Sequence, residues 1–135
     1  MIIILSACSD IIENDNVIID KSYLEAWQDT LTSFGIAIND TTLPLADQRA
    51  GSIRRAKENL YHNLYDSIMI QKISKENIVS DLFLDENNLD LKESILSYSS
   101  NNLIIGNIKY YENFVEMYGS IKTDSIIIII NNFKE

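Results

Sequence analysis

The feature that most constrains the fold is a long amphipathic stretch in the middle of the chain, from about residue 46 to residue 71. Apolar residues recur there at intervals of three and four, at Ile53, Ala56, Leu60, Leu64 and Ile68. This spacing places them on one face of an α-helix. A helix of this kind gains most of its stability by packing that face against other elements. The rest of the chain must therefore supply a core beside it.

The segment before this stretch predicts another helix, over residues 22–34. Ser22 and Glu25 have the spacing of a capping box, in which each side chain bonds the backbone amide of the other residue. An apolar stripe follows at Leu24, Trp27, Leu31 and Phe34. Gly35 is expected to end this helix, because glycine adopts the left-handed conformation without a steric penalty.

The second half of the chain carries similar signals. Further helices are predicted over residues 74–84, 91–98 and 103–118, and the last is expected to end at Gly119. The final segment, 125–133, contains five consecutive Ile residues, whose β-branched side chains favour a strand. Because the sequence offers it no partner strand, we interpret this segment as a buried helix.

Together these elements predict an all-α fold, a small bundle of about five to six helices behind an N-terminal tether, since helices pack through their apolar stripes. A chain of 135 residues is expected to form one domain. We place this helical domain at residues 21–135. A weak repeat of helical hairpins, near 58–84 and 106–133, is a further hypothesis, because each segment joins a Tyr-rich helix end, a short turn and a new helix cap.

The first residues resemble the end of a bacterial lipoprotein signal peptide. The sequence Leu-Ser-Ala-Cys at residues 5–8 matches the lipobox, in which cleavage before the cysteine accompanies its lipidation, and Cys8 is the only cysteine in the chain. The resemblance implies a residual signal peptide over 1–7, lipidation at Cys8 and an acidic tether over 8–20. The alternative is a buried N-terminal strand over 2–7, with Cys8 acting as a small core residue.

Two segments of the second half resemble a family of small, uncharacterised lipoproteins from Bacteroidota, known as a domain of unknown function. Residues 73–84 are similar to the family's first helix with its Asp-Leu-x-Leu centre, and residues 110–124 to its Tyr-Tyr helix, Tyr-Gly turn and next cap. With the lipobox, this resemblance implies a lipid-anchored protein of the cell envelope, facing the periplasm or the outside. It implies no functional residues beyond the lipidated cysteine.

The charge of the chain excludes some partners. A net charge of −9 argues against nucleic acid, because phosphate binding depends on Lys and Arg. Most of the positive charge of the middle segment is clustered at Arg49, Arg54, Arg55 and Lys57. We interpret this cluster either as a solvated helix face or as a site for an acidic partner. The Tyr residues and the single Trp either line a groove for a peptide or glycan or, at helical spacing, form core and core edge.

The sequence offers no set of catalytic or metal-binding residues. One His and one Cys do not make a zinc site. The acidic segment 85–90 lacks the Gly and Glu that a calcium loop requires. The only histidine, His62, lies between Tyr and Asn on the long predicted helix, where a structural role is more common than catalysis. We therefore assign no catalytic residue, no metal ligand and no cofactor.

These observations favour a lipid-anchored envelope protein that acts by binding another protein. One alternative is a hydrolase that uses His62, a Tyr and a carboxylate in a cleft between helices. Another is an inhibitor or immunity lipoprotein, whose charge would steer a basic partner towards it. In addition, Thr41 is a candidate for modification, because Asp-Thr-Thr at residues 40–42 resembles the O-glycosylation signal of exported Bacteroidota proteins.

Overall fold

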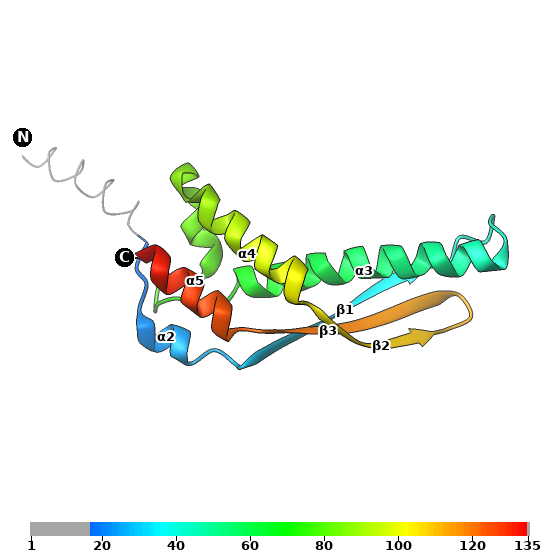
Figure 1. Ribbon diagram of the computed structural model, residues 1–135, viewed down its shortest axis with the longest axis horizontal. Coiled ribbons are helices and arrows are strands. Elements are labelled where there is room, and N and C mark those ends of the chain that lie inside the picture. Colours follow the sequence, from blue (N-terminus) through cyan, green and yellow to red (C-terminus); the bar gives the residue numbers. More distant parts are fainter. Residues whose placement is uncertain (1–16, 135) are drawn as a thin grey trace, which may run out of the picture.

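A three-stranded antiparallel sheet with a long helix along one face forms the centre of the fold (Figure 1). The computed structural model describes residues 17–134. The strands are β1 (Thr30–Ile38), β2 (Ile104–Tyr110) and β3 (Phe114–Lys122), in the spatial order β1-β3-β2. The predicted all-α bundle is therefore wrong, and the segment 21–135 is not a purely helical domain.

The long helix α3 (Leu45–Met69) confirms the prediction from the periodic stretch. It packs on β1 and β3, and its predicted stripe forms the contact surface. Ala56, Leu60, Leu64 and Ile68 are fully buried, and Ile53 packs against the cluster that contains Ala56 and Leu60. We call the face of the sheet under α3 the inner face and the opposite face the outer face.

The predicted helix over 22–34 is wrong beyond its first turn. Only α2 (Lys21–Glu25) is helical, and Asp20 caps it by accepting a hydrogen bond of 3.0 Å from the Ser22 amide. From residue 30 onward the chain alternates as a strand, with Leu31, Gly35 and Ala37 buried and the residues between them more exposed. The apolar residues at helical spacing do not share one face of the strand, because Leu31 and Phe34 lie on opposite faces of β1.

The predicted helix over 103–118 is a β-hairpin formed by β2 and β3. Strand β3 alternates strictly, burying Val115, Met117, Gly119 and Ile121 on the inner face. The segment is rich in β-branched and aromatic residues, which favour strands when a neighbouring strand is present. Because residues 106–133 begin in a β-hairpin, the predicted repeat of helical hairpins is not seen.

The remaining helices lie at one end of the molecule (Figure 1). Instead of a regular α-helix over 74–84, the chain forms 3-10 turns η1 (Val79–Leu84) and η2 (Glu86–Asn88), then α4 (Leu89–Asn102). The Ile-rich segment is helical as predicted, in α5 (Asp124–Lys134). Ile126 and Ile130 are fully buried there, one helical turn apart.

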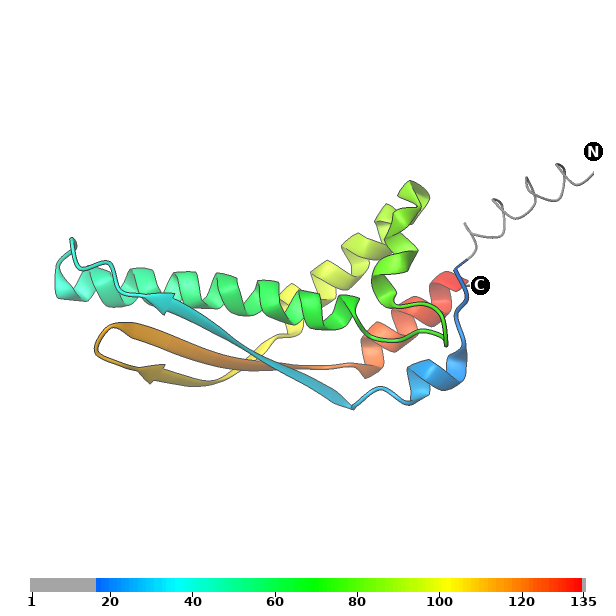
Figure 2. The ribbon, with the colours of Figure 1, turned by 180° about the vertical axis from the view of Figure 1, so that it is seen from behind.

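The core consists of two clusters that follow this layout. The larger cluster joins α2, the end of α3, α4 and α5, and the smaller one fills the space between α3 and the sheet. In Figure 2, no helix of the described part lies across the outer face. None of the helices within residues 17–134 has the length and apolar character needed to cross a membrane.

The predicted signal peptide, the lipidated Cys8 and most of the predicted tether lie outside the described residues. The end of the tether is described, and it packs against the segment after α3. The Ile18 amide donates to Asn77 Oδ1 at 3.0 Å, and the Asp20 amide donates to the Ile73 carbonyl oxygen at 2.6 Å. The folded part therefore begins before α2.

Candidate functional site

His62 does not lie in a cleft. Its side chain is 73 % exposed on α3, and Nε2 lies 3.6 Å from Oδ2 of Asp66, which is itself 61 % exposed. A hydrolase based on His62 requires a concave pocket that shields the histidine and an acid from water, and neither group has one. Within residues 17–134 there is also no cluster of three or more His, Cys, Asp or Glu side chains able to hold a metal ion.

The predicted basic cluster on α3 is divided between the two sides of the helix. Arg49 turns towards β2, where its guanidinium carbon lies 5.5 Å from the centre of the Tyr110 ring. Arg55 turns towards β1 and donates from Nη2 to the Ile38 carbonyl oxygen at 2.9 Å. Lys57 lies over the ring of Tyr61 at 5.9 Å. Arg49, Arg54 and Lys57 are exposed, whereas Arg55 is half-buried against β1.

Side chains of α3 cover the free edge of β1 over residues 34–38. Asn59 Oδ1 accepts a hydrogen bond of 2.9 Å from the Ile36 amide, and Asn63 Nδ2 donates to the Phe34 carbonyl oxygen at 2.8 Å. With the bond from Arg55, three side chains bond to backbone groups that face away from β3. An edge strand covered in this way is protected against pairing with another chain.

The free edge of β2 is open. The Tyr111 amide donates to the Phe114 carbonyl oxygen at 2.9 Å, and Lys109 lies opposite Glu116 in the ladder. Because an antiparallel strand alternates between groups that face its partner and groups that face away, the backbone groups of Ile108 and Tyr110 point away from β3. No other residue in the described part of the chain hydrogen-bonds to them.

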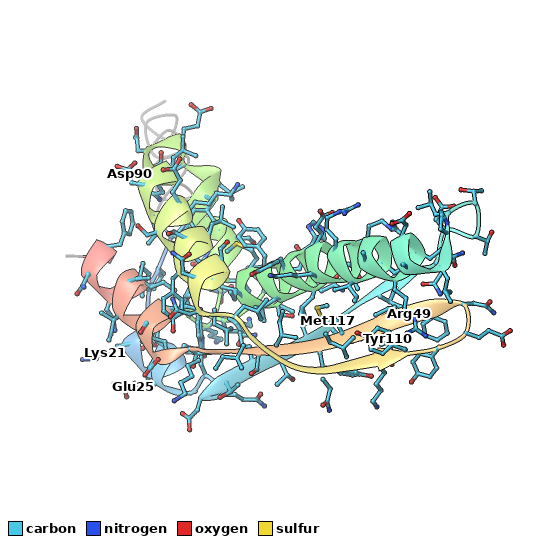
Figure 3. All side chains as sticks on the ribbon, turned by 45° about the vertical axis from the view of Figure 1, so that its right-hand side comes forward. Lys21, Glu25, Arg49, Asp90, Tyr110 and Met117 are labelled. Atoms are coloured by element: carbon cyan, nitrogen blue, oxygen red, sulfur yellow. The ribbon has the colours of Figure 1, made fainter. Side chains whose placement is uncertain are left out.

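The side chains of β2 are as uncovered as its backbone. All 7 residues of the strand are exposed, whereas β3 beside it buries alternate residues. Ile108 and Tyr110 lie opposite Met117 and Val115, so they share the inner face, but α3 covers only the neighbouring strands. Figure 3 shows Arg49 on α3 and Tyr110 on β2 next to each other at this border.

The outer face carries a group of aromatic rings around one carboxylate. Glu116 Oε1 accepts hydrogen bonds from the hydroxyl groups of Tyr111 at 3.2 Å and Tyr118 at 3.1 Å. The hydrogen bond to Glu116 raises the pKa of Tyr118, with smaller contributions from desolvation and from the nearby negative charge. Desolvation raises the pKa of Tyr111, and the charge of Glu116 adds to the effect.

This arrangement changes the surroundings of Lys109. Lys109 and Glu116 are direct cross-strand neighbours, a position in which opposite charges commonly pair. Here the carboxylate is bonded to the two tyrosines, and Lys109 Nζ instead lies 5.2 Å from the centre of the Tyr118 ring. Tyr118 in turn packs beside Phe34, with ring centres 6.1 Å apart. The cation therefore has no carboxylate partner.

A shallow hollow of about 460 Å³ follows the same face between β1 and β2. Its lining is uncharged and partly aromatic, and consists of Thr32, Ser33, Phe34, Gly106, Asn107, Tyr118, Gly119 and Ser120. Two of these residues, Gly106 and Asn107, lie where the pairing of β2 with β3 shifts by one position. The hollow therefore continues to the open edge of β2.

Sequence reasoning missed this surface because it assigned residues 103–118 to a helix. The available signal was the composition of 104–110, where Ile and Tyr are typical of a strand.

The other predicted site, Thr41, is exposed in a turn, where Asp40 Oδ1 accepts hydrogen bonds from the amide and hydroxyl of Thr42 at 3.0 and 2.6 Å. Those hydrogen bonds lower the pKa of Asp40.

Comparison with protein-family models, with curated proteins and with solved structures finds no significant match to this chain. The fold and the surface chemistry are therefore the basis for assigning a function. The most distinctive feature is the contrast between the closed edge of β1 and the open edge of β2.

Proposed function

We propose that this chain is a protein-binding module that takes up an extended segment of a partner along the open edge of β2. In this mode of recognition a peptide adds a strand to a sheet, main-chain hydrogen bonds supply affinity, and side-chain contacts on the two faces supply specificity. The observation that carries the proposal is the contrast between the two edges. Three side chains of α3 bond the edge of β1 over residues 34–38, and no side chain in the described part of the chain bonds the edge of β2.

The surroundings of β2 support the proposal. A partner strand beside β2 would find the backbone groups of Ile108 and Tyr110 directed towards it. It would also cover apolar surface that is now exposed, including Ile104, which is 59 % exposed, and Tyr110, which is 51 % exposed. Burying such surface is the main favourable term in protein association. Exposed edges of this kind are otherwise a liability for aggregation.

We further propose that the module is held at the bacterial cell envelope by lipid on Cys8. The support is the lipobox at residues 5–8 and the resemblance of residues 73–84 and 110–124 to Bacteroidota lipoproteins. Mass spectrometry of the N-terminus, after expression in a related host with the native upstream sequence, tests this proposal. A mature chain that begins at an acylated Cys8 is expected, and an unmodified chain that keeps Met1 would contradict it.

The binding proposal is tested by replacing Ile108 in two ways. Ile108→Pro removes an amide that points away from β3, whereas the matched variant Ile108→Val keeps the amide and trims one methyl group. We expect partners captured from envelope extract by the natural protein to be retained by Ile108→Val and lost by Ile108→Pro. Equal retention by both variants would show that the partner does not pair with this edge.

A further inference from the structure

We propose that the segment bound along β2 is acidic, with one carboxylate that reaches Lys109 on the outer face and a second that reaches Arg49 on the inner face. This inference rests on the proposed strand addition and names the chemistry of the partner. The partner is an extended stretch of protein with two neighbouring acidic residues, flanked by an apolar residue opposite Ile108.

The first half of the argument concerns Lys109. It is the only charged residue of β2, it is exposed, and the carboxylate directly opposite it is bonded to two tyrosine hydroxyl groups. Its ammonium group rests on the ring of Tyr118 at 5.2 Å. The ring of Tyr118 on β3 thus holds the cation on the outer face beside β2, where it remains exposed to a carboxylate from outside.

The second half concerns Arg49, which stands on the other face of the same edge. Its guanidinium carbon lies 5.5 Å from the centre of the Tyr110 ring, and its side chain is exposed. Within residues 17–134 the only side-chain ion pair is His62 with Asp66, so neither Arg49 nor Lys109 has a carboxylate within 4.0 Å. In a chain with 20 acidic residues, two unpaired cations at one open edge form a local site for negative charge.

The geometry of an added strand determines the positions of the acidic residues in the partner. Residues opposite one another in antiparallel strands share a face, and successive residues alternate between faces. The partner residue opposite Lys109 therefore points to the outer face. Its two neighbours, opposite Ile108 and Tyr110, point to the inner face, where Arg49 lies over the Tyr110 ring. The partner satisfies all three positions when it carries an acidic residue opposite Lys109, an acidic residue opposite Tyr110 and an apolar residue opposite Ile108.

The net charge sharpens the selectivity. The net charge of −9 disfavours the approach of acidic segments in general, so that binding of one at β2 depends on the two cations beside that edge. A basic segment at β2 would instead meet two like charges, and unfavourable charge placement of this kind is a common basis of partner discrimination. Added salt should weaken the bound state, because both cations are exposed.

Three capped peptides of alternating Thr and Val residues test the proposal with the complete protein. One carries two neighbouring Glu residues, the second carries Gln at those positions, and the third carries Lys. Affinity is measured by fluorescence anisotropy, and the position of binding by amide hydrogen exchange at Ile108 and Tyr110. We expect the Glu peptide to bind about fivefold or more tightly than the Gln peptide, from two exposed charge pairs, and to protect both amides.

Two variants assign the effect to the named cations. Lys109→Gln and Arg49→Gln should each weaken the Glu peptide about threefold and leave the Gln peptide unchanged. Lys122→Gln and Arg54→Gln, which remove exposed cations elsewhere on β3 and α3, should change neither peptide.

Failure of the acidic preference is distinguishable from failure of strand addition. Glu and Gln peptides that bind equally and both protect the β2 amides would overturn the acidic preference and leave strand addition standing. A Glu peptide that binds without protecting those amides would overturn the inference, because its site would lie elsewhere. Three peptides that neither bind nor protect β2 would contradict strand addition itself.

Discussion

Gly35 of β1 lies directly against the backbone of Leu60 on α3. A Cβ atom on residue 35 would come within 2.9 Å of Leu60 Cα and closer still to the Leu60 amide nitrogen and the Ala56 carbonyl oxygen. This contact lets α3 approach the sheet closely enough for Asn59 and Asn63 to reach the backbone of β1. The close approach of helix and strand therefore also closes one edge of the sheet.

Replacing this glycine should loosen the contact between α3 and the sheet. Gly35→Ala places a methyl group against helix backbone that cannot move aside, so we expect a loss of about 3 kcal/mol in the free energy of unfolding. Gly106→Ala is the matched control, because nothing lies within 4 Å of a Cβ atom at that position. Urea denaturation of both variants checks this, and equal stability would show that the contact is looser than described.

Removing the side chains that close β1 should have two consequences. The double variant Asn59→Ala and Asn63→Ala loses two hydrogen bonds to the backbone of β1, which should lower the free energy of unfolding by about 2 kcal/mol. It also opens a second edge, so self-association should rise with protein concentration. Denaturation and sedimentation measure the two effects. Glu58→Ala, an exposed position on the same helix, should change neither one.

Proline substitution should distinguish the two sides of the β2 backbone. Ile108→Pro removes an amide that faces away from β3, which an edge strand tolerates, so we expect a loss of about 1 kcal/mol or less. Lys109→Pro removes an amide that faces Glu116 in the ladder and should cost about 3 kcal/mol. If the two variants were equally unstable in thermal and urea unfolding, the assignment of the open groups would be wrong.

The tyrosines around Glu116 should titrate abnormally. Their raised pKa means that the folded protein keeps both phenol protons to higher pH than the unfolded chain does. The resulting stabilisation is complete below the ordinary tyrosine pKa of about 10 and is lost as the pH rises through the raised value.

Replacing the carboxylate tests the cause of this shift. Glu116→Gln should lower the pKa of Tyr118 towards its ordinary value, whereas Glu112→Gln, in the exposed turn of the hairpin, should leave it unchanged. Absorbance titration and tyrosine resonances measure the pKa of each phenol. A Tyr118 that titrates identically in the natural protein and in Glu116→Gln would exclude the described hydrogen bond.

The sequence predicts the helical part of this fold well and the sheet poorly. The stripe of α3 repeats over many turns, so chance cannot produce it, and the prediction holds to within about two residues at each end. The Ile-rich α5 was also correctly placed. Its β-branched residues favour a strand, but Ile126 and Ile130 fit into the core one helical turn apart.

The strands were missed because short apolar runs satisfy both periods. In 30–38 and 114–122, residues spaced by three or four coexist with alternating burial, which is strict only in 114–122, and the neighbouring strand decides between the two periods. Gly35 and Gly119 are typical helix ends by sequence, yet each lies within a strand where side chains or backbone of other elements come close. The open edge of β2 exists only because β2 pairs with β3, and the sequence alone does not predict that pairing.

Photocrosslinking in cells tests the central claim most directly. A photoreactive residue is placed at Ile108, on the open edge, or at Ile36, on the edge covered by Asn59, in the complete protein. We predict a discrete covalent adduct with another protein from position 108, with a lower yield when cells are lysed in high salt before irradiation, and none from position 36. Adducts from position 36 alone, or equal adducts from both positions, would contradict the account.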